Sequence, residues 1–481
     1  MMNMLRRIRL FRHHIRPTLE RCEQRIAPAI ATLANGVLTI DYTATGTTSE
    51  SVTVTNTDNF ISLSGNIVGA TSNLTTDVGA IAVHDIGGSN NQSLSLTGNY
   101  PFTFTLSGGL SCTDVETVLI TRPIKVLGLS SLSVSAPKMI VVSASVTSVD
   151  GNISLSANQQ NIPTSGNFPG IDVGGQISSS TGNITLIGRG GDDSAGGQCG
   201  ILVDANVGGG TQGTVSLTGM GGASAGSANH GVSVESGDIT SSSSTISVTG
   251  QGGANAAQGD GAGVYIIGHI SSASGDIVLT GTGKGAGPSN SGDGVSVEYT
   301  ASISAGGYGS ITISGTISAN GPHGVGLRIA DSISSVNGPI TITTHGGVAS
   351  LGNVKASGAG AISIANTFLG VPNTGIGLQA TVSSAGGVIS IAGASATPAD
   401  LDIFIAATIV TTQVAPVSIS LAGQIQLGLI YGSSTLSANI ATSGDITLNS
   451  GGNLTQIVGY VQASNGTVLV NAPGKTATFA K

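Results

Sequence analysis

Two carboxylates in neighbouring repeats are the residues whose types and spacing come nearest to an active site. In each aligned repeat one position follows a short apolar strand, and it holds in turn Gly174, Asp204, Glu235, Ile267, Glu298 and Arg328. Adjacent strands of a sheet lie about 5 Å apart, so Asp204 and Glu235 are expected at about that spacing. A retaining glycosidase holds its two carboxyl groups about 5–5.5 Å apart.

The surroundings of this pair favour a structural role over catalysis. No aromatic platform and no cluster of basic residues or His accompanies Asp204 and Glu235 in the aligned sequence. Stacked acids can also raise one pKa or attract a cation without any catalysis. We therefore predict a solvated face with no catalytic residue; the alternative is a polysaccharide-active lyase or glycosidase that uses Asp204 and Glu235. Glu298 and Arg328 are predicted to form a surface ion pair worth about 0–1 kcal/mol.

A second aligned position carries side chains of the kind that bind metals. It directly precedes a glycine in each repeat and holds Cys199, His230, Ala262, Asp293 and His323. Neighbours there supply two ligands at most, whereas a structural zinc site needs four. Cys22 lies in the basic leader, and the remaining Cys112 and Cys199 have neither a disulfide framework nor C-x-x-C spacing and are predicted to be free. The sequence therefore predicts no metal and no cofactor.

Glycine-rich segments follow one strand of each long repeat. Gly188-Arg189-Gly190-Gly191 is not followed by a helix, and no Lys-Ser/Thr sequence closes it. A phosphate cradle needs the amides of a helix N-terminus, so we interpret these glycines as tight turns. The loops also hold acids suited to loose Ca²⁺ binding, although the nonapeptide Ca²⁺ repeat is missing. These acids are Asp192, Asp193, Asp260 and Asp293.

The elements that must position these residues repeat along the chain. The first apolar residue of one strand recurs at a constant interval, at positions 153, 184, 215, 246 and 277. The pattern continues less regularly at Ile311, Ile340, Ile362, Ile389, Val417, Ile446 and Val468. A fixed period of about 20–50 residues is typical of solenoids and arrays.

Each repeat contains three short runs in which β-branched residues dominate. Between residues 200 and 218 these runs hold Ile201 and Val203, then Val207, then Val215 and Leu217. Alternation at period two indicates strands. We predict an all-β, right-handed parallel β-helix with three short strands per coil, stacked apolar residues inside, and an outer hydroxyl ladder. The ladder is formed by Thr185, Ser216, Ser247, Thr312 and Thr341.

The length of a repeat divides into a bare coil and an insertion. Leu132 and Ile153 are 21 residues apart, and two later gaps are 22 residues, so the bare coil has 21–22 residues. The 31-residue coils then carry inserted loops at one point of the coil, and such insertions often form the binding side. A propeller blade needs four strands, for which 21–22 residues are too few.

The period also suggests how the chain is divided. We predict a basic leader at 1–31, a β cap with early irregular coils at 32–130, a regular solenoid at 131–393, and less regular coils at 394–481. A solenoid has two exposed edges that need caps. Few residues follow the last predicted strand, so we expect either self-association through the solenoid ends or a tail, 472–481, that folds over the edge.

Composition and charge exclude several classes of protein. Charged residues are only 8% of the chain, too few for an intrinsically disordered protein of high net charge. No uninterrupted apolar run reaches the roughly 18 residues that a membrane-spanning helix needs, so no transmembrane segment is predicted. Seven arginines lie before residue 26, whereas past residue 30 nine basic residues face 22 carboxylates, a net charge of −13. That acidic body argues against binding to nucleic acid.

Two segments resemble known families. Residues 19–29 resemble the short N-terminal export-type motif of planctomycete extracellular proteins, a Leu-Glu…Glu-x-Arg…Pro pattern carried here by Leu19, Glu20, Glu23, Arg25 and Pro28. The resemblance implies an exported protein; the alternative is a disordered basic N-terminus. Residues 132–188 and 444–451 are similar to filamentous-haemagglutinin-like β-strand repeats, which implies a solenoid at the cell surface.

These observations predict a function class and no individual ligand. We expect a non-enzymatic, extracellular or cell-surface, adhesin-like β-helical protein that binds glycans or other surface partners through its stacked Gly-rich loops. The loops lie between residues 187 and 294, and Asp193, Asn255, Asp260 and Asn290 supply hydrogen-bonding groups. The alternative is that the loops have no binding role.

Overall fold

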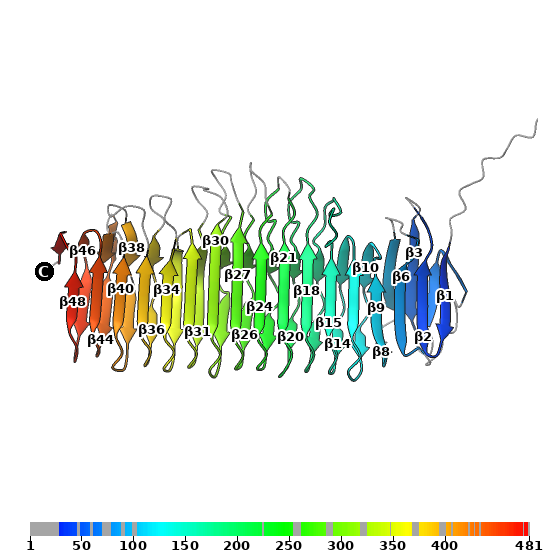
Figure 1. Ribbon diagram of the computed structural model, residues 1–481, viewed down its shortest axis with the longest axis horizontal. Helices are drawn as coiled ribbons and strands as arrows, with labels where there is room; N and C mark the ends of the chain where they lie inside the picture. Colours follow the sequence, from blue (N-terminus) through cyan, green and yellow to red (C-terminus); the bar gives the residue numbers. More distant parts are fainter. Residues whose placement is uncertain are drawn as a thin grey trace, which may run out of the picture.

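The computed structural model is an elongated stack of short strands (Figure 1). It describes residues 28–479 apart from short gaps, the longest of which are 70–77, 254–260, 285–291, 318–324, 368–374 and 394–400. Every secondary-structure element assigned within these residues is a β-strand, so the predicted all-β class is confirmed. The strands of successive repeats lie side by side along the rod (Figure 1).

One sheet of 18 strands runs the length of the rod. It contains one strand from each repeat together with three strands near the N-terminus, and its pairings are parallel except between its first two strands. The strands of this first sheet are β1 (Ala29–Ala34), β2 (Val37–Tyr42), β5 (Ile67–Gly69), β6 (Ala80–Asp85), β9 (Gly109–Thr113), β12 (Leu132–Ala136), β15 (Ile153–Ala157), β18 (Ile184–Arg189), β21 (Val215–Met220), β24 (Ile246–Gln251), β27 (Ile277–Gly283), β30 (Ile311–Ile317), β32 (Ile340–His345), β34 (Ile362–Asn366), β37 (Ile389–Gly393), β40 (Val417–Leu421), β45 (Ile446–Ser450) and β48 (Val468–Asn471).

A second sheet of 29 strands receives two strands from most repeats. The strands that matter for the candidate site are β16 (Ile171–Val173), β17 (Ile177–Ser179), β19 (Ile201–Val203), β20 (Val207–Gly209), β22 (Val232–Val234), β23 (Ile239–Ser241), β25 (Val264–Ile266), β26 (His269–Ser272), β28 (Val295–Val297) and β29 (Ser302–Ala305). From β12 to β27, each strand pairs in parallel with the strand three places later, as β15 does with β18 and β16 with β19.

The predicted register of the repeats is confirmed. Ile153 pairs with Ile184, Ile184 with Val215, Val215 with Ile246, and Ile246 with Ile277. The same ladder continues through every later apolar residue named in the sequence, down to Ile446 and Val468. The first of the bare-length intervals is confirmed too, because Leu132 pairs with Ile153.

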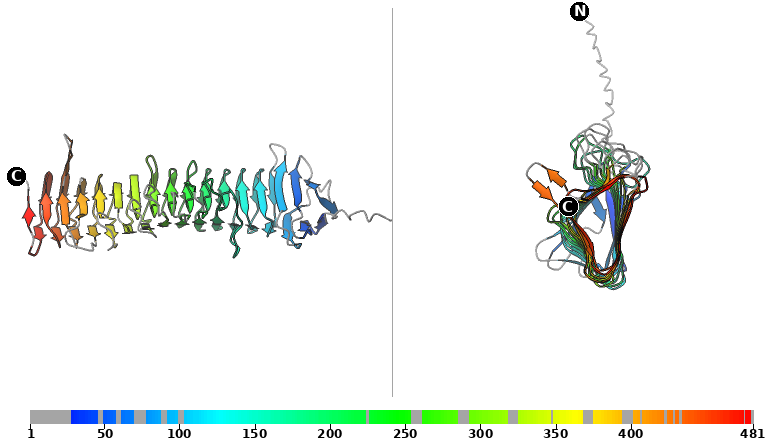
Figure 2. Two further views of the ribbon diagram at one scale, coloured as in Figure 1. Left: turned by 90° about the horizontal axis from the view of Figure 1, so that it is seen from above. Right: turned by 90° about the vertical axis from the view of Figure 1, so that its left-hand side faces the viewer.

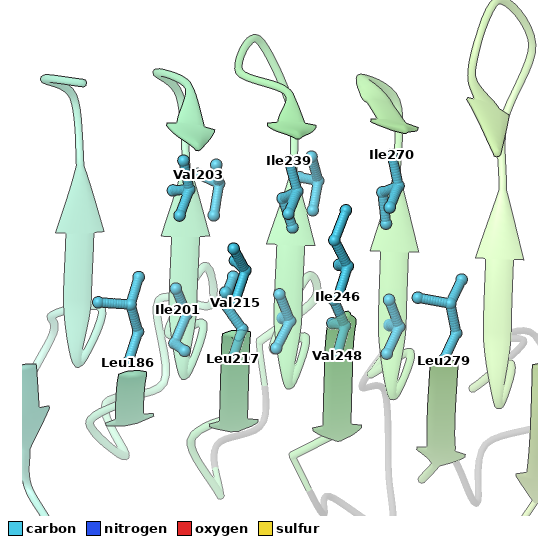
Figure 3. Packing of buried hydrophobic residues seen from close by; sticks show 14 of the residues in the cluster. Leu186, Ile201, Val203, Val215, Leu217, Ile239, Ile246, Val248, Ile270 and Leu279 are labelled. Atoms are coloured by element: carbon cyan, nitrogen blue, oxygen red, sulfur yellow. The ribbon is translucent and has the colours of Figure 1, made fainter. Parts of the chain in front are cut away.

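Alternation along each strand builds the core. Ile246 has no exposed surface and lies between Val215 and Ile277, among the buried Val and Leu side chains shown in Figure 3. The next residue, Ser247, points the other way; it is half-buried and continues the hydroxyl ladder from Thr185 through Ser216. Period-two alternation thus separates an apolar interior from a polar exterior, and burial of the apolar column stabilises the stack.

The inserted loops leave and rejoin the rod through a narrow neck of glycines. A Cβ on Gly219 would lie 2.0 Å from the carbonyl oxygen of Gly231, and one on Gly188 would lie 2.1 Å from that of Gly200. Two backbones therefore approach too closely for any side chain, which is why glycine recurs at both positions. Tight turning alone, as predicted from the sequence, does not explain these glycines. The described parts of these loops lie at one corner of the rod (Figure 2).

The regular pairing changes beyond residue 326. Strand β31 (Leu327–Ser335) is continuous and pairs with both β28 and β29, which are separate strands one repeat earlier. Strand β33 (Val348–Ala356) pairs with β31 through register shifts. At the other end, β1 pairs with β2 and β3 (Glu50–Asn56) with β4 (Ile61–Gly65) in antiparallel fashion. In these two hairpins β2 and β3 also pair in parallel with β6 and β7 (Gln92–Gly98), so the hairpins join the parallel sheets.

Candidate functional site

The candidate site is the outer surface of β16, β19, β22, β25 and β28 with the residues just before and after each strand; we call it the loop-side face. Asp204 and Glu235 hold equivalent places on it. The amide of Asp204 donates to the Val173 carbonyl at 2.9 Å, and that of Glu235 donates to the Val203 carbonyl at 2.9 Å. The structure therefore brings the two predicted acids to successive strands, as their spacing indicated.

The two acids have different surroundings. Asp204 is exposed, whereas Glu235 is half-buried and its Oε1 accepts a hydrogen bond from Ser233 Oγ at 3.0 Å. A third acid, Asp172, lies on β16 beside them. Burial raises the pKa of Asp172, and the nearby charge of Asp204 raises it further. The sequence-based prediction did not include Asp172, although its outward position in the Ile-Asp-Val strand was a signal for it.

An aromatic ring also lies on this face, contrary to the prediction that no aromatic platform accompanies the acids. Tyr265 is in register with Ser233, whose hydroxyl binds Glu235. The Tyr265 ring stacks on His230, with ring centroids 4.5 Å apart and planes 7° from parallel. The pair was missed because it joins two different columns of the alignment, and only packing shows that they meet.

Cys199 and His230 are neighbours in the predicted column but are tied to the backbone. Cys199 Sγ donates to the Ala228 carbonyl at 3.5 Å, and His230 Nδ1 accepts the Ala262 amide at 3.2 Å. Burial raises the pKa of Cys199 to about 12 and lowers the pKa of His230 to about 4. Both are therefore neutral at pH 7, and a neutral thiol is a poor metal ligand. Within the described part of the chain, no three His, Cys, Asp or Glu side chains gather where they could hold a metal ion.

The predicted alignment of Arg328 with Glu298 is wrong. Arg328 is in register with Ser296, which precedes Glu298 on the neighbouring strand. The shift arises because the coil from Val295 to its partner Leu327 is longer than the alignment assumed. Arg328 Nε donates to Asp293 Oδ2 at 2.8 Å, so Asp293 has the ion pair expected at Glu298. Glu298 Oε1 accepts a hydrogen bond from Ser296 Oγ at 2.8 Å.

The same shift changes the predicted neighbour of Asp293. The Gly294 amide donates to the Val325 carbonyl, as the Gly263 amide does to that of Asp293 one repeat earlier. Val325 therefore takes the place predicted for His323, which itself lies outside the described residues. Asp293 Oδ1 also accepts the Val325 amide at 3.2 Å.

The bases of the inserted loops form a hydrogen-bonded layer of their own. Gln198 Nε2 donates to Asn167 Oδ1 at 3.1 Å, and the Gln198 amide donates to Asn229 Oδ1 at 3.0 Å. Both Gln198 and Asn229 are buried. These three residues recur at the interval of the repeat, a signal that was present in the sequence but was not among the predicted columns. The loops are therefore stacked on one another where they join the rod.

The acids named for these loops bind the backbone where the structure describes them. Asp193 Oδ1 accepts the Ala195 amide at 2.9 Å, and Asp192 Oδ1 accepts the Gly166 amide at 3.2 Å. Three other residues named as ligand-binding groups, Asn255, Asp260 and Asn290, lie outside the described residues. Asp193 thus forms an Asx-type turn, and Asp192 links its loop to the loop of the preceding repeat.

Comparisons with known proteins identify no relative: no family model, no curated protein and no solved structure matches the chain. Among the described residues, no helix has the length and apolar character needed to cross a membrane.

Proposed function

We propose that the protein is a non-enzymatic, exported, cell-surface rod with an adhesin-like role, and that it binds glycans through the stacked loops of the loop-side face. We further propose that the rod is a right-handed β-helix with three strands per coil. The pairing of each strand with the strand three places later, from β12 to β27, supports that coil. Right-handed connection is the strong preference for parallel strands in one sheet.

The observation that carries the non-enzymatic proposal is the internal bonding of the polar groups that could do chemistry. Glu235 is held by Ser233, Glu298 by Ser296, and Asp293 by Arg328. His230 is buried, neutral and stacked on Tyr265, so it is poorly placed to carry a proton to a substrate. Side chains that are held by such internal bonds stabilise a surface and are not free to act on a substrate.

Export and glycan binding have separate support. Export follows from the resemblance of residues 19–29 to the planctomycete motif, and cell fractionation tests it; recovery of the protein in the cytoplasm would contradict it. Glycan binding is proposed from the stacking of successive inserted loops, whose bases are joined through Asn167, Gln198 and Asn229 and whose described parts lie at one corner of the rod (Figure 2). Repeated polar groups at a fixed spacing suit a polymer with a repeating unit.

Shortening the loops tests the binding proposal. A variant reduces the segments between β18 and β19 and between β21 and β22 to the length of a bare coil and keeps the glycine neck. Its matched control replaces Ser242 and Ser243 by Ala, in a turn at another point of the same repeat. On a glycan array we expect the shortened variant alone to lose binding. Binding retained by a folded shortened variant would contradict the proposal.

The alternative function is a polysaccharide-active enzyme, and one observation favours it. Asp172, Asp204 and Glu235 belong to successive strands of one face, Tyr265 lies on the strand next to that of Glu235, and the pKa of Asp172 is raised, as it would be for a general acid. The test incubates the protein with acidic and neutral polysaccharides and follows new reducing ends or unsaturated products. Turnover that Asp204→Asn abolishes would replace the non-enzymatic proposal with this one.

A further inference from the structure

The last strands of the rod have an unpaired edge. β47 (Gly459–Ala463) pairs with β44 (Ala438–Thr442), and β48 pairs with β45. Strand β49 (Ala477–Thr478) follows them and pairs with β46 (Leu454–Gln456). Among the described residues, no strand pairs with the opposite edge of these three strands, and β48 stands at the end of the stack in Figure 1. The Ile446 amide donates to the Thr467 carbonyl at 2.8 Å, so Thr467 faces β45. Because backbone groups alternate in a parallel ladder, those of Val468 and Val470 face the open edge.

The apolar interior is open at the same end. Val468 is 44% exposed, whereas Ile446, the residue it stacks on, is fully buried. Val461 and Val470 are only partly buried against the core, and Leu469 on the outer side is 57% exposed. Free backbone groups and uncovered apolar side chains together form a surface that another strand edge would complete.

The edge strands β47 and β48 themselves contain no charged residue and no Pro, and Pro473 and Lys475 follow β48 in the sequence. Between Asp402 and Lys475 the sequence contains one charged residue, Asp445. Natural edge strands are commonly guarded by Lys, by Pro or by a bulge. Without such charges, two identical ends meet with little electrostatic repulsion, so the chemistry of the surface suits a second copy of itself.

The N-terminal end is different. Its outermost strands are β4 and β5, and Gly65 and Gly69 at their ends have φ values of +117° and +100°, a backbone conformation outside that of a regular strand. Seven arginines precede this end in the sequence, and they would repel the same segment of a second copy. Both features disfavour pairing through the N-terminal end.

We propose that two copies of this chain associate through their C-terminal ends, with β48 of one copy paired antiparallel to β48 of the other. A two-fold axis between the ends makes the contact self-complementary and closes the assembly as a dimer. The contact covers Val468 and Val461 and gives hydrogen-bond partners to the free groups of Val468 and Val470. The two loop-side faces then lie on one long rod, where they can engage a surface together.

The test measures mass and length of the full chain in solution. Sedimentation and small-angle X-ray scattering should show a dimer whose maximum dimension is about twice that of the monomer. Val468→Lys places like charges at the two-fold contact, and Val468→Pro removes an amide that faces the open edge without breaking a bond to β45. Both variants should be monomeric where the unchanged chain is dimeric. Leu129→Lys, at an apolar residue that is 85% exposed and far along the chain, is the control and should stay dimeric.

Three results would overturn the proposal: a monomer at every concentration, a dimer that both Val468 variants retain, or a dimer with the maximum dimension of one rod. Circular dichroism checks that each variant keeps its strand content. Because Val468 is partly exposed at the last strand, each variant should keep its fold. Glycan binding by the separate loops is measured on the same monomeric variants, so failure of one proposal leaves the other testable.

Discussion

Ile246 illustrates what one residue contributes when the same position repeats along a stack. It has no exposed surface and packs between Val215 and Ile277, so each ladder residue stabilises the two coils beside its own. Gln251, by contrast, ends the same strand and is half-buried on its outer side. Gln251 pairs with Met220 and Thr282 as the last residue of β24.

Ile246→Asp should lower the free energy of unfolding by at least about 4 kcal/mol, because it buries an unpaired carboxyl in the apolar ladder. Gln251→Ala should change it by no more than about 0.5 kcal/mol. Denaturant unfolding followed by circular dichroism measures both. Equal losses of stability would show that the two side chains do not differ in burial.

His230 predicts how stability depends on pH. Burial lowers the pKa of His230 from 6.5 to about 4, so between these values the unfolded chain binds a proton that the folded protein does not. Stability is therefore lost as the pH falls through this window, by roughly 3 kcal/mol at pH 4. His230→Gln should remove this part of the loss. The measurement is the difference in unfolding free energy between the two proteins at pH 7 and pH 4; a difference that does not change with pH would contradict the prediction.

At the scale of the element, the glycine neck decides where a loop can be inserted. A strand of the first sheet runs past its last core residue, and the returning backbone crosses it within the reach of a Cβ. Gly219 and Gly250 mark the outgoing chain in successive repeats, and Gly231 and Gly263 mark the returning chain. The loops can therefore vary beyond the neck, while the neck itself cannot accept a side chain.

Gly219→Ala should lower the free energy of unfolding by about 2 kcal/mol or more, because its Cβ would lie 2.0 Å from the Gly231 carbonyl oxygen and the backbones must separate. Gly208→Ala is the matched control. Its Cβ would meet only the Thr240 hydroxyl at 3.2 Å, so stability should stay the same or rise by up to about 1 kcal/mol. Thermal unfolding of the pair measures the difference, and equal effects would contradict a tight neck.

At the scale of the whole molecule, each coil contacts only its neighbours, so stability is not uniform along the rod. Interior residues of β15 through β27 are fully buried by coils on both sides, whereas β48 has one neighbour and exposes Val468. A coil with one neighbour opens more easily than one with two.

We therefore expect amide hydrogen exchange to be slowest in β15 through β27 and fastest in β47 and β48. The experiment uses the Val468→Lys variant, in which the proposed contact between ends cannot protect the last strands. Mass spectrometry of peptic fragments gives the exchange along the chain. Uniform protection from end to end would indicate a single cooperative unit and contradict the prediction.

The amino-acid sequence alone was enough to identify the strands and their partners in most of the rod. Ile153, Ile184, Val215, Ile246 and Ile277 recur at one spacing, and stacking of like on like is the arrangement that buries all of them at once. The same spacing placed Asp204 and Glu235 on successive strands. A constant period predicts the register because the coil length sets which residues pair between neighbouring strands. The alternation along each strand then sets which of those residues face the core.

The contacts between the aligned columns, and the point at which the period fails, became visible only in three dimensions. Arg328 pairs with Asp293 because a coil of different length shifts the register after β28, and spacing alone could not show which residues were extra. The contact between the His230 and Tyr265 rings joins residues from two aligned columns in neighbouring coils. The glycine neck depends on the close crossing of two backbone segments. Such contacts follow from the path of the chain in space, which a one-dimensional repeat does not encode.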